Sequence, residues 1–144
     1  MPEAKPTFCF IGFGEACQAI ASGLREAGVE RIAAWDIAFP HTEGERLKRA
    51  GEAIGVRCAS SAAEALRGAD IVVSAVTAAA SVDAAQSVKP HLAGRPFFLD
   101  INSVSSGKKQ ETAKLLGDGA RYIDAAAAKK APGVVAIVTG ARCV

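Results

Sequence analysis

Three residues near the N-terminus have the types and spacing needed to hold a diphosphate and its attached ribose. Gly12 and Gly14 follow a short apolar run, and Asp36 lies 24 positions after Gly12. Gly12 permits a tight turn from strand to helix, Gly14 lets a phosphate approach the backbone, and a helix starting at Glu15 offers free N–H groups to an anion. This pattern is typical of a dinucleotide-binding turn, in which an acidic residue follows at a spacing of about 20.

Asp36 favours NAD over NADP as the dinucleotide. A carboxylate at the end of the second strand accepts hydrogen bonds from both ribose hydroxyls and repels a 2′-phosphate. Arg46, Lys48 and Arg49 follow in a region that could face such a phosphate. We favour a solvated helix face for these three cations, because charged runs of this kind usually face water.

Cys17 stands where the pattern G-x-G-x-x-G has its third glycine. That position serves packing between helix and strand, so another small residue fits and the match is weakened without being lost. We expect a buried, inert thiol, as free cysteines usually are. The alternative is a reactive thiol, with its pKa lowered by the first turn of the helix.

The composition limits the classes of function. The 144 residues are 50% hydrophobic and 22% charged, which is enough for one domain with a core. A formal net charge of +2 does not indicate nucleic acid or a membrane surface as partner. The four cysteines form no C-x-x-C pair and no metal site with a histidine. No signal peptide or membrane span is evident, so we expect a cytoplasmic protein.

Apolar runs alternate along the chain with segments of helical spacing. Two of the helices start at capping boxes, Thr42-x-x-Glu45 and Ser61-x-x-Glu64. Because strands buried on both faces alternate with helices, we expect an α/β fold with a doubly wound, mainly parallel sheet. The expected strands are 7–11, 31–37, 56–58, 71–76, 97–101, 122–124 and 134–139, and the expected helices are 15–27, 42–50, 61–67, 81–88 and 106–116.

Five stretches together carry a family resemblance: 10–16 (FIGFGEA), 23–28 (GLREAG), 34–36 (AWD), 68–77 (GADIVVSAVT) and 99–107 (LDINSVSSG). They resemble the N-terminal NAD(P)-binding domain of the 6-phosphogluconate dehydrogenase / β-hydroxyacid dehydrogenase superfamily, in its phosphogluconate-dehydrogenase-like branch. The resemblance extends over about residues 7–124 and implies a Rossmann-type fold.

The resemblance also implies where ligands bind. Val76 and Thr77 would line the cofactor through their backbone, Ser103 would lie near the nicotinamide, and Asn102 and Ser103 would face the substrate. Both segments follow central strands, where open α/β sheets bind ligands, although Asn and Ser also favour helix caps. The cofactor residues expected in this way are Gly12, Phe13, Gly14, Glu15, Ala16, Asp36, Val76, Thr77 and Ser103.

In the enzymes that the chain resembles, an all-helical domain follows and supplies the general acid/base lysine. The match becomes poor after Asp124, and Lys108 and Lys109 do not correspond in position to that lysine. We therefore expect residues 1–144 to be a single NAD(P)-binding Rossmann domain, truncated at its C-terminal end. It would have no catalytic residue of its own, although the resemblance implies hydride transfer with a small hydroxyacid-type substrate.

Two hypotheses of different class remain. The chain is the cofactor-binding module of an oxidoreductase, or it is a non-catalytic Rossmann-like protein that binds a nucleotide or pairs with another subunit. Gly12, Gly14 and Asp36 together favour the first, since a pure scaffold does not need all three. A homo-oligomer with shared clefts is a third, less favoured arrangement because it lacks a base. Size-exclusion chromatography distinguishes the first two hypotheses, because a non-catalytic subunit would have to form a stable complex with its partner.

Overall fold

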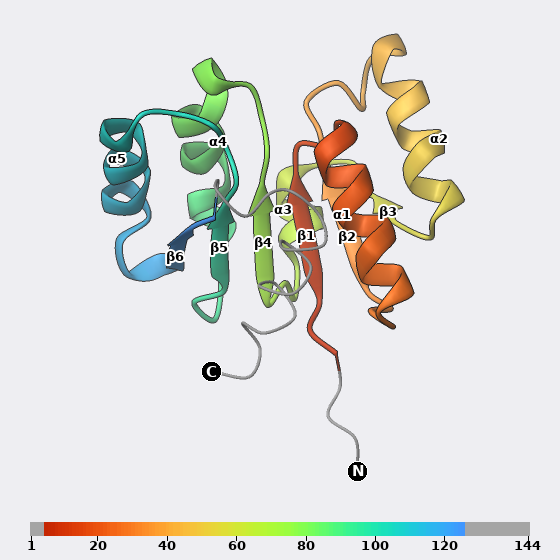
Figure 1. Ribbon diagram of the computed structural model, residues 1–144, viewed down its shortest axis with the longest axis horizontal. Coiled ribbons are helices and arrows are strands. Elements are labelled where there is room, and N and C mark those ends of the chain that lie inside the picture. The colour runs from red at the N-terminus through yellow and green to blue at the C-terminus, as the bar shows by residue number, and fades with distance from the viewer. Residues whose placement is uncertain (1–4, 126–144) are drawn as a thin grey trace.

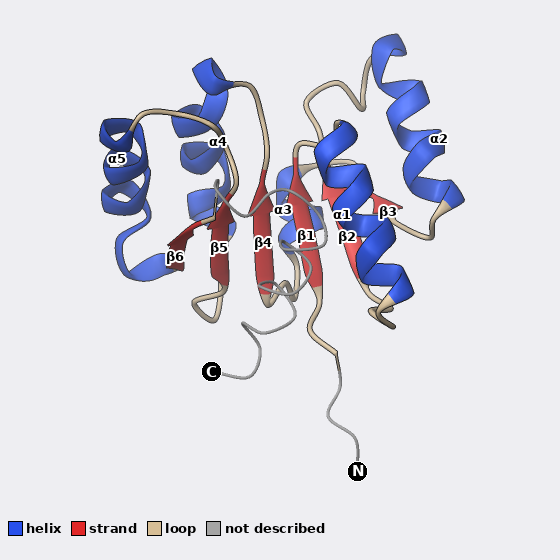
Figure 2. Cartoon of the chain, in the orientation of Figure 1, coloured by secondary structure: helices blue, strands red, loops and turns tan. Residues whose placement is uncertain are grey.

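The apolar runs of the sequence form the strands of one parallel sheet (Figures 1 and 2). The computed structural model describes residues 5–125. The strands are β1 (Phe8–Ile11), β2 (Ile32–Trp35), β3 (Arg57–Cys58), β4 (Ile71–Ser74), β5 (Phe97–Asp100) and β6 (Arg121–Asp124). Their order across the sheet is β3-β2-β1-β4-β5-β6, which confirms the doubly wound α/β arrangement.

The helices that connect the strands lie on both faces of the sheet (Figure 1). They are α1 (Glu15–Glu26), α2 (Glu45–Ala53), α3 (Ala62–Leu66), α4 (Ser81–Val88) and α5 (Ser106–Leu116). Short 3₁₀ turns lie at Thr42–Gly44, Ala78–Ala80, Lys89–His91 and Gly117–Gly119. None of the helices within residues 5–125 is long and apolar enough to cross a membrane.

Two apolar clusters hold the layers together. On one face, Ile20 and Leu24 of α1 pack against Phe8 and Phe10 of β1, and α2 joins this cluster through Leu47. On the other face, side chains of α3, α4 and α5 pack against Cys9, Val72 and Phe98. Because β1, β4 and β5 are covered on both sides, their residues are almost continuously apolar, as expected of central parallel strands.

The chain reverses its direction of winding between β1 and β4. From β1 it runs outward to β2 and β3, and it then returns to β4 on the other side of β1. The carboxyl ends of these two strands diverge into loops that leave in opposite directions, and open α/β sheets bind ligands in the crevice there. The topology therefore places any ligand of this fold at the ends of β1 and β4.

Two strands end two residues earlier than expected, because polar groups of the residues that follow them bond elsewhere. The expected strand 31–37 ends at Trp35, since the Asp36 carboxylate accepts the Ala38 N–H and closes a turn. The expected strand 71–76 ends at Ser74, since the Val76 N–H donates to the Asn102 side chain instead of to a neighbouring strand. The expected strand 134–139 lies outside the described residues.

One of the two expected capping boxes is confirmed in part, and the other is wrong. The Ser61 hydroxyl accepts the Glu64 N–H at 3.1 Å and caps α3, whereas the Glu64 carboxylate bonds Ser60 instead of returning to Ser61. Thr42 caps nothing: it starts a 3₁₀ turn, and α2 begins only at Glu45. Gly44 allows this shift, because a Cβ there would lie 2.0 Å from the Ala38 carbonyl oxygen.

Candidate functional site

The loop after β1 contains two glycines that the structure uses differently. Gly12 has φ +89°, and a Cβ at this position would lie 2.1 Å from the Ala75 carbonyl oxygen, so the fold itself requires glycine. Gly14 has φ −75°, and nothing lies within 4 Å of the position that its Cβ would take. The fold itself therefore does not need glycine at position 14.

Gly14 is also the N-cap of α1, and no side chain caps this helix. Gly14, Glu15 and Ala16 are exposed, so the N–H groups of the first turn face solvent. A helix start with uncapped N–H groups and an open approach over a glycine is suited to an anion such as a pyrophosphate.

Asp36 connects the end of β2 to the glycine loop. Its Oδ2 accepts the Phe13 N–H at 2.8 Å, and its Oδ1 accepts the Ala38 N–H at 2.9 Å. Phe13 itself is fully buried, with its ring edge-on to Phe10 and to Phe39, so it packs beneath the loop. Each carboxylate oxygen of the half-buried Asp36 retains lone-pair capacity for a further donor.

The thiol in the first turn of α1 faces the core. Cys17 is fully buried, and this burial raises the pKa of its thiol far above the ordinary value, with the Asp36 carboxylate adding to the rise. The buried, inert interpretation is therefore confirmed, and the alternative of a lowered pKa is wrong. Cys9 is buried in the same way, and its pKa is raised to about 12.

Asn102 lies at the end of β5 and bonds to the end of β4. Its Oδ1 accepts the Val76 N–H at 2.7 Å, and its Nδ2 donates to the Asp100 carboxylate at 2.8 Å and to the Ser74 hydroxyl at 3.1 Å. Thr77 and Ser103 are exposed beside it. The helix-capping alternative for Asn102 and Ser103 is wrong, because Ser105 caps α5 by accepting the Lys108 N–H.

Below Asn102 lies a buried group of charges that the sequence analysis did not identify. The Lys109 Nζ lies 3.0 Å from Asp100 Oδ1 and 3.1 Å from Asp124 Oδ1, and it also donates to the Asp100 carbonyl. The Tyr122 hydroxyl donates to Asp100 Oδ2 at 2.7 Å. Burial and the Asp100 carboxylate both raise the pKa of Tyr122 well above its usual value.

A periodic signal in the sequence could have revealed Lys109. Lys109, Thr112 and Leu116 are the buried residues of α5, and they share one face of the helix at spacings of three and four. Lys108, its neighbour, instead reaches the Ala78 carbonyl at 3.1 Å. A lysine on the same helix face as a core leucine is a candidate for a buried charge, and it needs an acidic partner.

The expected site residues thus meet along one edge of the sheet. The ends of β2, β1, β4 and β5 bring Asp36, the glycine loop, Val76 with Thr77, and Asn102 with Ser103 into this order. Residues 5–125 contain no group of His, Cys, Asp and Glu side chains able to hold a metal ion. The edge offers backbone N–H groups, one carboxylate and hydroxyl groups, which suits an extended phosphate-containing ligand.

Known proteins resemble this chain in sequence and in fold. A family model described as coenzyme F420-dependent NADP oxidoreductase matches residues 7–104. In a search of curated proteins by sequence, none matches the chain. Among solved structures, a conserved hypothetical protein from Sinorhizobium meliloti 1021 matches with a TM-score of 0.73 and 33% identity, covering 82% of this chain and 39% of that protein.

Two further solved structures extend the comparison. A Mycobacterium tuberculosis 3-hydroxyisobutyrate dehydrogenase, in a structure with L-serine, has a TM-score of 0.71 and 24% identity over 81% of this chain and 38% of its own. A conserved protein of unknown function, described as structurally similar to 3-hydroxyacid dehydrogenases, has a TM-score of 0.69 and 27% identity over 82% and 42%. The chain spans about two fifths of the length of each of these structures.

Proposed function

The chain belongs to the family of coenzyme F420-dependent NADP oxidoreductases, and on that premise we propose where and how it holds a nicotinamide dinucleotide. The matched region carries the sheet, the glycine loop and the segments after β4 and β5. The family and the hydroxyacid dehydrogenase neighbours support an NAD(P)-binding, oxidoreductase-like domain with the Rossmann fold. The residue assignments, the cofactor preference and the reaction of the whole protein are our proposals.

One observation carries the cofactor assignment. Gly14 has an ordinary backbone conformation and open space around it, and it stands at an uncapped helix start. A side chain there would obstruct only a molecule lying over the loop. We therefore assign the pyrophosphate to the backbone N–H groups of residues 14–16, with Gly12 and Phe13 forming the turn beneath it.

The adenosine half of the cofactor is assigned to the end of β2. The Asp36 carboxylate, already oriented by the Phe13 and Ala38 N–H groups, would accept both ribose hydroxyls. Ile37 beside it is 78% exposed, the one large apolar side chain left exposed within residues 5–125, and it offers a surface for the adenine ring. The carboxylate would repel a 2′-phosphate, so we propose a preference for NAD over NADP.

The nicotinamide half then falls over the ends of β4 and β5. When bound, the nicotinamide supplies the acceptor or donor of a hydride. Val76 and Thr77 would line the ring through their backbone, and Ser103, with Asn102 beneath it, would border the substrate. For the whole protein we propose hydride transfer with a small hydroxyacid-type substrate.

Residues 5–125 do not contain a lysine placed as a general base at this edge. Lys109 is buried and its ammonium group already has three oxygen partners, and Lys108 donates to the Ala78 carbonyl. A base must be free to exchange a proton with the substrate hydroxyl. We propose that this domain binds and orients the cofactor and that the base comes from elsewhere, so that the isolated chain turns over little or no substrate.

Calorimetric titration of the chain with NADH and with NADPH tests the proposal. We expect saturable binding of both at or below millimolar concentration, tighter for NADH. The matched variant Gly14→Ala should remain folded and bind at least about tenfold more weakly, because a methyl group would lie in the path of the pyrophosphate. Absence of binding to the folded wild type at millimolar NADH and NADPH would refute the cofactor assignment.

A further inference from the structure

We propose that the buried Asp100–Lys109 ion pair positions the nicotinamide end of the site, by fixing the amide of Asn102 and through it the backbone at Val76. Asn102 then acts as a positioning residue that joins the ends of β4 and β5. The inference rests on the proposed function, because it assigns a task to residues beneath the same site. It adds a chain of contacts that runs from a helix outside the glycine motif to the loop lining the cofactor.

The orientation of the Asn102 amide is determined by its partners. The Val76 N–H can only donate, so it requires the Oδ1 of Asn102, which it meets at 2.7 Å. An ionised Asp100 carboxylate can only accept, so it requires the Nδ2, which it meets at 2.8 Å. A flipped amide would set two donors against each other at one end and two acceptors at the other.

Lys109 supplies the positive charge that the buried Asp100 carboxylate needs. Asp100 is 1% exposed, and a carboxylate buried without a cation carries a large desolvation cost. The Lys109 ammonium, whose side chain is 7% exposed, lies 3.0 Å from Oδ1 and supplies that cation. The ion pair therefore holds an acceptor beside the Asn102 Nδ2.

The consequence reaches the loop after β4. The Ala75 N–H donates to the Ile11 carbonyl, and the Val76 N–H donates to Asn102, so consecutive residues are held by β1 and by β5. The Val76 side chain also lies close to Gly12, within 3.0 Å of the position that a Cβ would take there. The Asn102 bond therefore sets the position of Val76 and Thr77 relative to the glycine loop, and hence the spacing between the two halves of the site.

Stability alone is a weak reason for such a cluster. Replacing a buried ion pair with apolar residues of similar volume is often neutral or stabilising, since desolvation offsets the attraction. Here every polar atom of the pair and of the Asn102 amide has a partner, and the bonds converge on one backbone N–H at the ligand edge. Such convergence is expected of a device that sets geometry.

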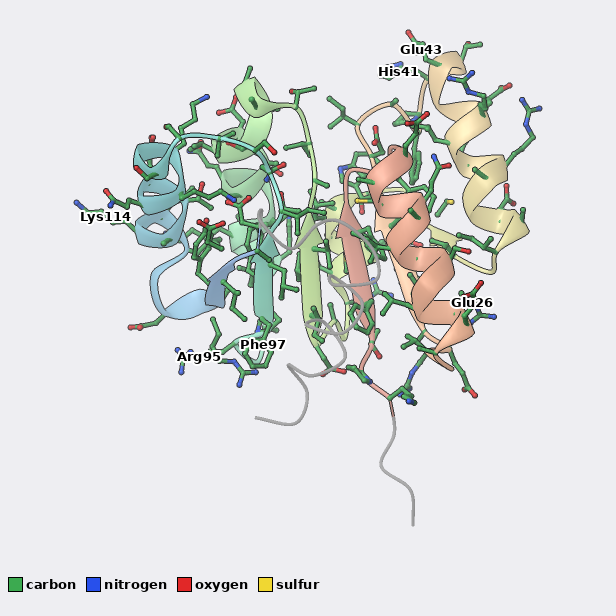
Figure 3. The ribbon with its side chains drawn as sticks, viewed as in Figure 1. Glu26, His41, Glu43, Arg95, Phe97 and Lys114 are labelled. Atoms are coloured by element: carbon green, nitrogen blue, oxygen red, sulfur yellow. The ribbon has the colours of Figure 1, made fainter. Side chains whose placement is uncertain are left out.

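The test compares NADH with ADP-ribose, which has the adenosine and diphosphate groups but lacks the nicotinamide. Affinities are measured for the full chain, for Asn102→Ala and for the double variant Asp100→Asn with Lys109→Met. We expect Asn102→Ala to weaken NADH binding about tenfold, the value of one buried hydrogen bond and the freedom it restrains, with ADP-ribose binding within about twofold of wild type. The matched control Lys114→Met, on the outer side of α5 (Figure 3), should change neither affinity.

The double variant protects the test against misfolding, because it removes both charges and leaves no unpaired buried ion. An amide at position 100 can present either a donor or an acceptor to Asn102, so NADH binding should again weaken selectively, by a smaller factor. Folding of each variant is checked by its thermal unfolding curve. Equal weakening of NADH and ADP-ribose, or no change in either, would overturn the inference. If the wild type binds neither ligand, the proposed function fails first.

Discussion

The two halves of the candidate site are built by different means. The half at the carboxyl ends of β1 and β2 consists of backbone groups, two glycines and a single carboxylate. Its residues 14–16 are open to solvent. The half at the carboxyl ends of β4 and β5 is supported by the buried Asp100–Lys109 ion pair and by the Asn102 amide, whose polar atoms are all hydrogen-bonded. In the proposed function the first half would bind the diphosphate mainly through backbone groups, whereas the second half depends on particular side chains brought together by the fold.

This difference has a consequence for how each half tolerates change. Backbone groups survive most substitutions, so the first half is vulnerable only where a side chain would occupy space. A buried ion pair is sensitive to substitution of either member, because the loss of one charge leaves the other unpaired. Apart from Gly12, which the fold itself requires, substitutions in the first half should therefore alter binding more than stability, and those in the second should alter stability strongly.

The largest effect is expected for Lys109→Met. It leaves the Asp100 carboxylate buried without its cation, which should lower the free energy of unfolding by about 3–5 kcal/mol. Urea denaturation measures the change, with Lys114→Met as the exposed control on the same helix. A loss below about 1 kcal/mol would show that the second half does not depend on this pair.

The two glycines of the loop sharpen the comparison within the first half. Gly12→Ala should lower the free energy of unfolding by about 3 kcal/mol, from its positive φ and the clash with the Ala75 carbonyl. Gly14→Ala should lower the stability by no more than about 1 kcal/mol, because its backbone conformation suits alanine although the N-cap position favours glycine. Paired denaturation curves and NADH titrations separate the two. Equal destabilisation by both would remove the distinction between a glycine needed by the fold and one needed by the ligand.

Asp36→Asn should have an intermediate effect on both properties. The neutral amide can accept only one of the Phe13 and Ala38 N–H groups well, which costs about 1 kcal/mol of stability. It also removes the charge that opposes a 2′-phosphate, so the ratio of NADH to NADPH affinity should fall. The exposed control Glu43→Gln, whose side chain lies at the outer end of the molecule (Figure 3), should leave the ratio unchanged. An unchanged ratio in Asp36→Asn would contradict its role in cofactor preference.

The smallest effect concerns alkaline stability. The pKa of Tyr122 is raised in the folded protein, because its neutral hydroxyl donates to Asp100. The unfolded chain releases this proton near pH 10, so the contribution is complete below that value and is lost as the pH rises above it. The raised pKa values of Cys9 and Cys17 also make stability decline with rising pH. That decline begins at lower pH and is the same in wild type and in Tyr122→Phe. The stability of Tyr122→Phe should therefore fall less steeply than that of wild type above pH 10, as thermal unfolding across pH 8–11 would show; parallel curves would contradict this.

What could be predicted from sequence follows the same division. The glycine loop and Asp36 belong to a local pattern, so their neighbourhood follows from the order of strand, turn and helix. Buried strands and Gly-terminated helices likewise gave the topology correctly. Lys109 could not be assigned, because its partners Asp100 and Asp124 come from two other elements that only the assembled sheet brings near. Thr42 failed as a cap because Gly44 packs against Ala38, a contact across a turn that no capping pattern contains.

Hydrogen exchange of the chain with and without saturating NADH tests the central claim most directly. The account predicts slower exchange at the N–H groups of residues 12–17, 36–38 and 75–77, which all lie at the carboxyl edge of the sheet. Arg31, Arg57 and Arg67 line a hollow near the opposite, amino ends of the strands, and exchange there should not change. Protection around that hollow, or an unchanged pattern throughout, would contradict a dinucleotide bound across the ends of β1 and β4.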